Sequence, residues 1–224
     1  MKNRTLSAKK LKDVNLWKQQ LGTVPDELWD NVGMETLILA DNALTTISPK
    51  IGRLKNMRTL DLGHNQLSAL PESIGELKNL QDFLYLHDNA LHSLPSSFKK
   101  LLSLRYLNIS ENQFEKLPLE ICQLSELLEL RATDNQLRSL PSCIGKLTKL
   151  RELHLRNNRL KTLPDCIEEL PNLKQLDLRG NPLVNLPVSM AKMSLDKLDL
   201  RWTPTLNLPK WTAALERRGC LIYK

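Results

Sequence analysis

Residues 153–160 read Leu-His-Leu-Arg-Asn-Asn-Arg-Leu, and this pattern of spaced aliphatic residues followed by an asparagine returns along the chain. Residues 60–67, 107–114 and 176–183 are further copies. The asparagine stands at positions 42, 65, 89, 112, 135, 158 and 181, so the spacing is 23 residues except for one spacing of 24. A regular period of this length predicts a stack of similar units rather than a globule with one central core.

The repeats extend beyond the copies that contain the asparagine. Gln19 lies 23 residues before Asn42, and Thr203 lies 22 residues after Asn181, and both are framed by aliphatic residues. We therefore predict nine repeats over residues 11–208, of which the first and the last are atypical, as terminal repeats usually are.

The ends of the array are expected to differ from its repeats. Residues 1–10 form a polar N-terminal flank, and residues 209–224 form a cap with a short helix ended by Gly219 and a closing strand. An open solenoid end exposes its core, so large apolar side chains are expected to shield it. We assign this role to the four tryptophans, Trp17, Trp29, Trp202 and Trp211.

Each repeat contains a short strand and a short helical turn. In Leu-x-x-Leu-x-Leu the alternating leucines point to one face and the intervening residues to the other, so stacked parallel strands have a core face and a solvent face. The segment Leu-Pro-x-x-Ile-x-x-Leu, as at residues 70–77 and 140–147, suits one helical or 3₁₀ turn that begins after the proline. The predicted fold class is α/β, a curved solenoid with a parallel sheet on its concave face and helical or 3₁₀ turns on its convex face.

The repeated asparagine follows the strand, where the chain turns. Its amide can bond to backbone groups that the turn leaves without partners. Stacked at the same position of successive repeats, these side chains form a predicted structural ladder of Asn42, Asn65, Asn89, Asn112, Asn135, Asn158 and Asn181.

The 23-residue repeat with Leu-Pro-x-x-Ile-x-x-Leu resembles the intracellular Ras-group leucine-rich-repeat proteins and the repeats of Scribble and Erbin type scaffolds, over roughly residues 11–208. The resemblance implies a leucine-rich-repeat solenoid that binds a partner protein on its concave face, as a monomeric scaffold or adaptor in signalling. In some relatives the partner is a small GTPase or a phosphatase. One scaffold hosts many partners, so the resemblance does not select among them.

Two other functions remain as alternatives. Repeats of this kind also form the binding domain of larger effectors or enzymes of the ubiquitin-ligase or kinase type, which would need more than the sixteen residues that follow Leu208. The second alternative is weak binding of nucleic acid or anionic membrane through the basic termini. Of the net charge of +7, residues 1–20 carry +5 and residues 201–224 carry +4, which leaves −2 for the repeats between them. Termini this short mostly serve solubility, so neither ligand is expected.

The compartment is inferred from apolar segments and cysteines. The sequence has no run of 18 apolar residues, and its first residues are polar and basic. Its cysteines form no Cys-x-x-Cys pair, and none lies in the first half of the chain. We expect reduced thiols and a cytoplasmic location. Cys143 and Cys166 are expected to stack as small buried side chains on the convex side, with a bridge between them as the alternative.

The outward-facing strand residues of the concave face are the candidate binding surface. The chain has only three Phe and three Tyr, yet Phe83, Tyr85 and Tyr106 fall on two neighbouring strands beside His87. Clustered exposed aromatic side chains are typical of protein-binding hot spots. The 24-residue repeat lies here, so either Phe83 or Leu84 could occupy the core position, and a bulge in this strand would restore the register.

Charged residues alternate in the C-terminal half of this face. The expected pairs are Glu129 with Arg131, Glu152 with Arg156, Asp177 with Arg179, and Asp199 with Arg201. Such pairs either neutralise one another or bind a partner of mixed charge. The predicted partner-binding residues are Phe83, Tyr85, His87, Tyr106, Arg131, His154, Arg156, Arg179 and Arg201.

Catalysis and cofactor binding are not expected. The sequence has no Gly-x-Ser-x-Gly, no His-Glu-x-x-His and no phosphate-binding glycine loop, and a shallow regular sheet rarely supplies a pocket with convergent groups. We predict no cofactor, no small-molecule substrate and no metal. The alternative is a surface metal site at His64, His87 and Asp88, which has few ligands and no thiolate.

Overall fold

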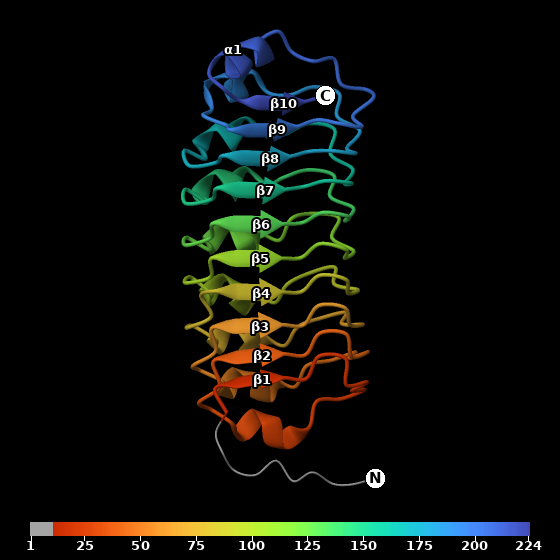
Figure 1. Ribbon diagram of the computed structural model, residues 1–224, viewed down its shortest axis with the longest axis vertical. Coiled ribbons are helices and arrows are strands. Elements are labelled where there is room, and N and C mark those ends of the chain that lie inside the picture. The colour runs from red at the N-terminus through yellow and green to blue at the C-terminus, as the bar shows by residue number, and fades with distance from the viewer. Residues whose placement is uncertain (1–10) are drawn as a thin grey trace.

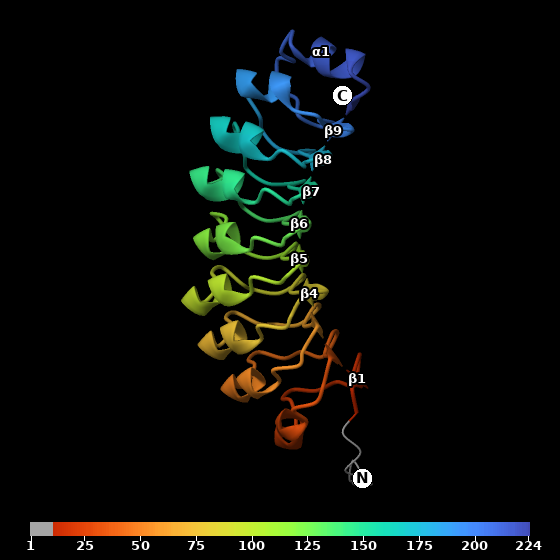
Figure 2. The same cartoon turned by 90° about the vertical axis from the view of Figure 1, so that its left-hand side faces the viewer.

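The computed structural model describes residues 11–224, and these residues form one elongated solenoid (Figure 1). Ten strands pair in parallel, each with the next along the chain, in a single sheet. Figure 2 shows the strands along the concave side of a shallow arc and the helical turns along the opposite side. The strands are β1 (Asp13–Asn15), β2 (Thr36–Ile38), β3 (Thr59–Asp61), β4 (Phe83–Tyr85), β5 (Tyr106–Asn108), β6 (Glu129–Arg131), β7 (Glu152–His154), β8 (Gln175–Asp177), β9 (Lys197–Asp199) and β10 (Leu221–Tyr223). The α/β solenoid predicted from the sequence is therefore confirmed.

The convex side is built from short 3₁₀ helices, because a fixed proline φ begins almost every one of them. A proline directly precedes each of these helices except η2, in which Pro49 is the first residue and Ser48 caps the N–H of Lys50. Their bounds are η1 (Asp26–Asp30), η2 (Pro49–Arg53), η3 (Glu72–Glu76), η4 (Ser96–Lys100), η5 (Leu119–Gln123), η6 (Ser142–Lys146), η7 (Asp165–Glu169) and η8 (Val188–Lys192).

The core runs the length of the solenoid between the two layers. The middle residue of each strand from β2 to β9 is a leucine that is at most 1% exposed, and the isoleucine of the Leu-Pro-x-x-Ile segments is fully buried. Residues on either side of the middle leucine point to the concave face. No helix among residues 11–224 is long and apolar enough to cross a membrane.

The 24-residue repeat keeps its strand regular. Leu84 occupies the core and is fully buried, whereas Phe83 is 43% exposed. In strand β4, Phe83 pairs in register with Thr59 on one side and with Tyr106 on the other. The predicted bulge within the strand is therefore wrong, because the extra residue lies before it, between the buried Leu80 and Phe83.

The seven repeated asparagines bond to the backbone at each turn. Asn158 is typical: its Nδ2 donates to the carbonyls of Ala132 at 2.8 Å and Leu155 at 3.0 Å, and its Oδ1 accepts from the N–H of Leu137 at 2.9 Å. Ala132 and Leu137 both belong to the preceding repeat, so each amide joins its own repeat to the one before it. This ladder satisfies backbone groups that lie buried at the end of each strand.

The cysteines depart from the expectation of reduced thiols. Cys122 and Cys143 form a disulfide, with their Cα atoms 5.7 Å apart. Cys143 was expected to stack on Cys166, which is a free, partly buried thiol. The reason is that Cys122 is the fourth residue of η5 and Cys143 the second of η6, so the two side chains meet diagonally between successive turns.

The C-terminal end is covered by helix α1 (Thr212–Arg217) and strand β10. Leu215 and Cys220 of this segment are buried against the last repeat. The expectation that all four tryptophans shield the ends is wrong for two of them. Trp29 is fully buried and Trp211 packs partly against the core, but Trp17 is 55% and Trp202 is 65% exposed.

Candidate protein-binding face

Three aromatic side chains form one exposed patch at the middle of the concave face. Phe83 and Tyr85 lie on the same face of β4, and their rings stack with centroids 5.9 Å apart. Tyr106 on β5 lies against both, with its ring centroid 5.4 Å from Phe83 and 5.1 Å from Tyr85. We call Phe83, Tyr85 and Tyr106 the aromatic patch. Because Phe98 and Phe114 are fully buried, this surface holds the only exposed phenylalanine among residues 11–224.

Two histidines extend the aromatic patch toward the end of the strands. The ring of His87 lies edge-on to Tyr85 at 6.0 Å and edge-on to His64 at 4.7 Å. His64 Nδ1 is 2.6 Å from Asp88 Oδ2, and the Nε2 atoms of the two histidines are 3.2 Å apart. Gly63 makes room for this arrangement, since a Cβ there would overlap the His87 ring.

Burial shifts the pKa values of this region toward neutral side chains. Desolvation is the main reason that the pKa of Tyr106 is raised to about 12. The nearby Arg131 guanidinium opposes this effect but does not cancel it. Burial also raises the pKa of Tyr85. Burial and the neighbouring His64 lower the pKa of His87. The patch is therefore uncharged near neutral pH, as suits contact with another protein surface.

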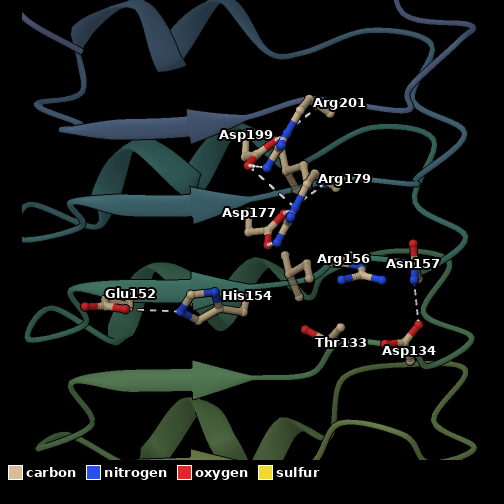
Figure 3. Close-up of polar contacts among 12 residues, drawn as sticks. Thr133, Asp134, Glu152, His154, Arg156, Asn157, Asp177, Arg179, Asp199 and Arg201 are labelled. Carbon is tan, nitrogen blue, oxygen red and sulfur yellow. Dashed lines mark hydrogen bonds and ion pairs between the residues drawn. The ribbon is translucent and has the colours of Figure 1, made fainter. Parts of the chain in front are cut away.

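Ion pairs occupy the C-terminal half of the face, and those on and after β8 and β9 form a connected network (Figure 3). Arg131 Nε lies 2.5 Å from Glu129 Oε1. Arg179 binds Asp177 through two nitrogens, at 2.9 and 2.5 Å, and lies 3.5 Å from Asp199. Arg201 also binds Asp199 through two nitrogens, at 3.0 and 2.8 Å. Three of the four expected pairs therefore form.

Asp199 anchors this network from inside the protein. Its residue is fully buried, and burial raises its pKa. Hydrogen bonds from Arg201 and the charges of Arg179 and Arg201 outweigh that effect and hold the pKa below its ordinary value. The carboxylate thus stays ionised and fixes both guanidinium groups.

The fourth expected pair, Glu152 with Arg156, is absent from the described part of the chain. Glu152 Oε2 lies 3.1 Å from His154 Nε2, and Glu152 Oε1 accepts from Gln175 at 3.3 Å. Along a strand, four residues span about 13 Å, whereas two span about 7 Å. Only the i, i+2 pairs are close enough to meet.

One group of side chains could hold a metal ion. Ligand atoms of Glu129, Glu152 and His154 all lie within 4.8 Å of one another and are partly buried. Two carboxylates and one imidazole are donors that zinc accepts. However, Arg131 already binds Glu129, and Gln175 binds Glu152. The arrangement is therefore explained by hydrogen bonds and ion pairs among these residues.

The structure places the nine predicted partner-binding residues on one face in two groups. Phe83, Tyr85, His87 and Tyr106 form the first, and Arg131 links it to the second because its guanidinium lies 6.0 Å from the Tyr106 ring. His154, Arg156, Arg179 and Arg201 form the second group on β7 to β9 and the residues that follow these strands. Sequence reasoning missed Trp202 as a member of this surface, since it assigned every tryptophan to the ends.

The stacked strands, the asparagine ladder and the convex 3₁₀ turns define the class of protein as a leucine-rich-repeat solenoid. The sequence matches the family described as "Leucine-rich repeat region" over residues 88–158. It also matches the family described as "Leucine rich repeat" over residues 32–91 and 139–183. The chain is a leucine-rich-repeat protein.

Several solved structures resemble the chain. A leucine-rich-repeat protein of Leptospira interrogans is 28% identical, with a TM-score of 0.74, over 96% of this chain and 66% of that one. The leucine-rich-repeat ectodomain of the plant membrane receptor kinase GASSHO1/SCHENGEN3 from Arabidopsis thaliana, in complex with CASPARIAN STRIP INTEGRITY FACTOR 2, is 34% identical, with a TM-score of 0.75, over 85% of this chain and 24% of that one. An internalin of Listeria monocytogenes is 19% identical, with a TM-score of 0.79, over 96% of this chain and 61% of that one, and shows the fold alone.

This chain thus spans less than two thirds of the length of these three proteins. A search of curated proteins finds no match. The fold and its neighbours fit a protein-binding module.

Proposed function

We propose that the concave face binds another protein, with the aromatic patch at the centre of the contact. The observation that supports this most directly is the cluster of the exposed Phe83 with the partly exposed Tyr85 and Tyr106 on two adjacent strands. Exposed aromatic clusters are uncommon on the surfaces of monomers and supply much of the binding energy of protein interfaces. The Arabidopsis receptor ectodomain, which was solved in complex with CASPARIAN STRIP INTEGRITY FACTOR 2, shares this repeat architecture.

We propose further that the chain acts as a scaffold or adaptor in signalling, as the resemblance to Ras-group and Scribble or Erbin type repeats implies. A small GTPase or a phosphatase is the class of partner to test first. A cytoplasmic location is part of this proposal. The Cys122–Cys143 disulfide counts against that location, because structural disulfides are rare in reducing compartments.

Electrostatic binding through the C-terminal basic residues receives no support. Arg218 donates to the carbonyls of Ala191 and Met193, and Arg217 donates to the carbonyl of Ala213 at 3.3 Å. These side chains satisfy backbone carbonyl groups of the cap and of the η8 turn. The basic residues of the N-terminal flank, residues 1–10, lie outside the described residues.

The test is quantitative capture of partner proteins by the immobilised chain. Wild type is compared with Tyr85→Ala/Tyr106→Ala and with a matched control, Leu119→Ala, on the convex side, where Leu119 is 63% exposed. We expect the tyrosine variant to lose the proteins that wild type and the control retain in equal amounts. Equal recovery of the same proteins by all three would refute the role of the aromatic patch.

A further inference from the structure

Arg156 is a cation of the concave face without an acidic partner. Its neighbours in the same column, Arg179 and Arg201, are each held by two bonds to a carboxylate. Among residues 11–224 the Arg156 side chain makes no ion pair, and its buried Nε has no hydrogen-bond partner. Leaving a buried charged donor without an acceptor costs free energy.

Arg156 is the only arginine of its column without a bound carboxylate. Asp177 and Asp199 bind Arg179 and Arg201. Figure 3 shows the Arg156 guanidinium on the side of β7 nearer to Thr133 and Asn157, away from Glu152. A carboxylate suits this guanidinium better than a phosphate dianion, which the acidic groups of the same region would repel.

Trp202 lies beside this cation and is exposed at a conformational cost. Its φ is +59°, in the left-handed region that bulky residues rarely adopt. Residues at the same turn of other repeats are smaller or polar, such as Asp134 and Asn157. Gly180, between Asn157 and Trp202 in this column, has no side chain to block the indole. Because the residue at this turn has a positive φ in the other repeats as well, the backbone conformation belongs to the repeat, and the unusual feature of position 202 is an indole that is 65% exposed.

The indole joins a charged and an apolar region. Its ring centroid is 6.0 Å from the Arg156 guanidinium carbon and 5.7 Å from that of Arg201. Trp202 also lines a pocket of about 350 Å³ with Leu200 and Leu206. The indole therefore stands between the two guanidinium groups and the pocket, and a ligand group bound to Arg156 would have the Trp202 ring beside it.

We propose that Arg156 and Trp202 form a carboxylate-binding subsite of the concave face. A carboxylate of the partner protein accepts hydrogen bonds from the Arg156 guanidinium, and the apolar atoms next to it pack on Trp202. This inference rests on the proposed function. The carboxylate is an Asp or Glu side chain or the C-terminus of a chain, and the experiment distinguishes these sources.

The probes are two random heptapeptide libraries that differ only at their ends, one with free C-terminal carboxylates and one with C-terminal amides. Immobilised protein is incubated with each, and retained peptides are sequenced by mass spectrometry. If the carboxylate is a side chain, both libraries yield peptides enriched in Asp or Glu. If it is a C-terminus, only the free-acid library yields retained peptides. Retention of no peptide, or of peptides without either preference, overturns the subsite.

The retained peptide with the strongest signal is then synthesised and its affinity is measured for wild type and four variants. Arg156→Gln is expected to lose about tenfold in affinity, as the loss of a charge-assisted hydrogen bond implies. Arg159→Gln removes an exposed arginine of the same repeat and should bind as wild type does. Trp202→Ala should also weaken binding, in contrast to Trp17→Ala at the opposite end.

A second measurement separates binding from folding. A double-mutant cycle pairs Arg156→Gln with replacement of the peptide carboxylate by its amide, and the two losses should not add. Because Arg156 has no bonded acidic partner, Arg156→Gln should also melt at or above the temperature of wild type. Additive losses would overturn the subsite. If the Tyr85→Ala/Tyr106→Ala variant meanwhile still loses its captured partner, the proposed function stands without the subsite.

Discussion

Replacing Asn158 with alanine tests whether the asparagine ladder holds the repeats together. Asn158 is 5% exposed, and its side chain makes four hydrogen bonds to the backbone. The Asn158→Ala change leaves the N–H of Leu137 without its acceptor and the carbonyl of Ala132 without its donor. The carbonyls of Leu155 and Arg156 each lose one bond but still accept from Asn181 Nδ2 and from the N–H of Asp134. An unsatisfied buried N–H costs about 1–3 kcal/mol, and each carbonyl costs less because it keeps a second bonding direction. We expect a total loss of about 3 kcal/mol in the free energy of unfolding.

The control is Asn172→Ala. Asn172 is exposed, and its Nδ2 makes a single bond of 2.7 Å to the carbonyl of Thr148. Water can replace that bond, so the expected loss is under about 1 kcal/mol. The two positions differ in burial and in the number of bonds but not in residue type, so helix or strand propensity contributes little to the comparison.

The assay is urea unfolding followed by circular dichroism, together with thermal melting. For a chain of this size 1 kcal/mol shifts the Tm by about 2–4 °C, so Asn158→Ala should melt about 6–12 °C below wild type. Because solenoids can unfold in parts, the far-ultraviolet and near-ultraviolet transitions are compared for each variant. Losses of the same size for Asn158→Ala and Asn172→Ala would refute the ladder as a source of stability.

Three further predictions follow from close contacts and ionisation. Gly75→Ala should lose about 1–3 kcal/mol in urea unfolding, since its Cβ would overlap the Ser97 carbonyl and lie 2.6 Å from the Ser97 Cβ, whereas Gly33→Ala, with nothing within 4 Å, should equal wild type. An ultraviolet absorbance titration should show one tyrosine that ionises near pH 12, and this transition should be lost in Tyr106→Phe and kept in Tyr223→Phe. Because the pKa of Tyr106 in the folded protein exceeds the ordinary value, the stability that this residue contributes falls as pH rises above about 10. Asp199→Asn should cost about 2 kcal/mol at neutral pH, and the difference from wild type should shrink as pH falls below about 4, since the lowered pKa of Asp199 stabilises the fold only above that range. A difference that stays constant down to pH values below the folded pKa would contradict the last of these.

The fold could be predicted because its information is repeated. The buried leucines and the ladder asparagines return with the same spacing, so an error at one position is corrected by the other copies. The aromatic patch was harder to predict, since Phe83 and Leu84 are both apolar and adjacent. Periodicity alone could not decide between them. The decision depends on Leu80, which fills its own core position and leaves Gln81 and Asp82 to take up the extra residue before the strand.

Contacts that depend on direction rather than spacing were predicted less well. Glu152 and Arg156 stand in the right columns, but they are four residues apart, whereas the acidic and basic residues that do pair, such as Asp177 and Arg179, are two apart. Cys122 and Cys143 are 21 residues apart, so a search at the repeat period overlooks a diagonal contact between successive turns. Trp202 was assigned to the terminal shield by its position in the sequence alone. Its place directly before the ladder position, where the other repeats also have a left-handed residue, puts it at the exposed turn that follows the strand.

In each strand the buried residues form the core and the outward residues form the surface. This division explains how one solenoid presents two kinds of chemistry on one face. Leu84 and Leu153 are both fully buried middle residues of their strands and are interchangeable as parts of the core. The residues beside them are Phe83 and Tyr85 in one case and Glu152 and His154 in the other. Because strand side chains alternate between faces, the outward residues change without disturbing the stacking that the leucines and the ladder maintain. An apolar centre and a charged C-terminal region can therefore lie on one continuous sheet, in which neighbouring strands are about 4.8 Å apart. The two regions can contact different parts of the same partner.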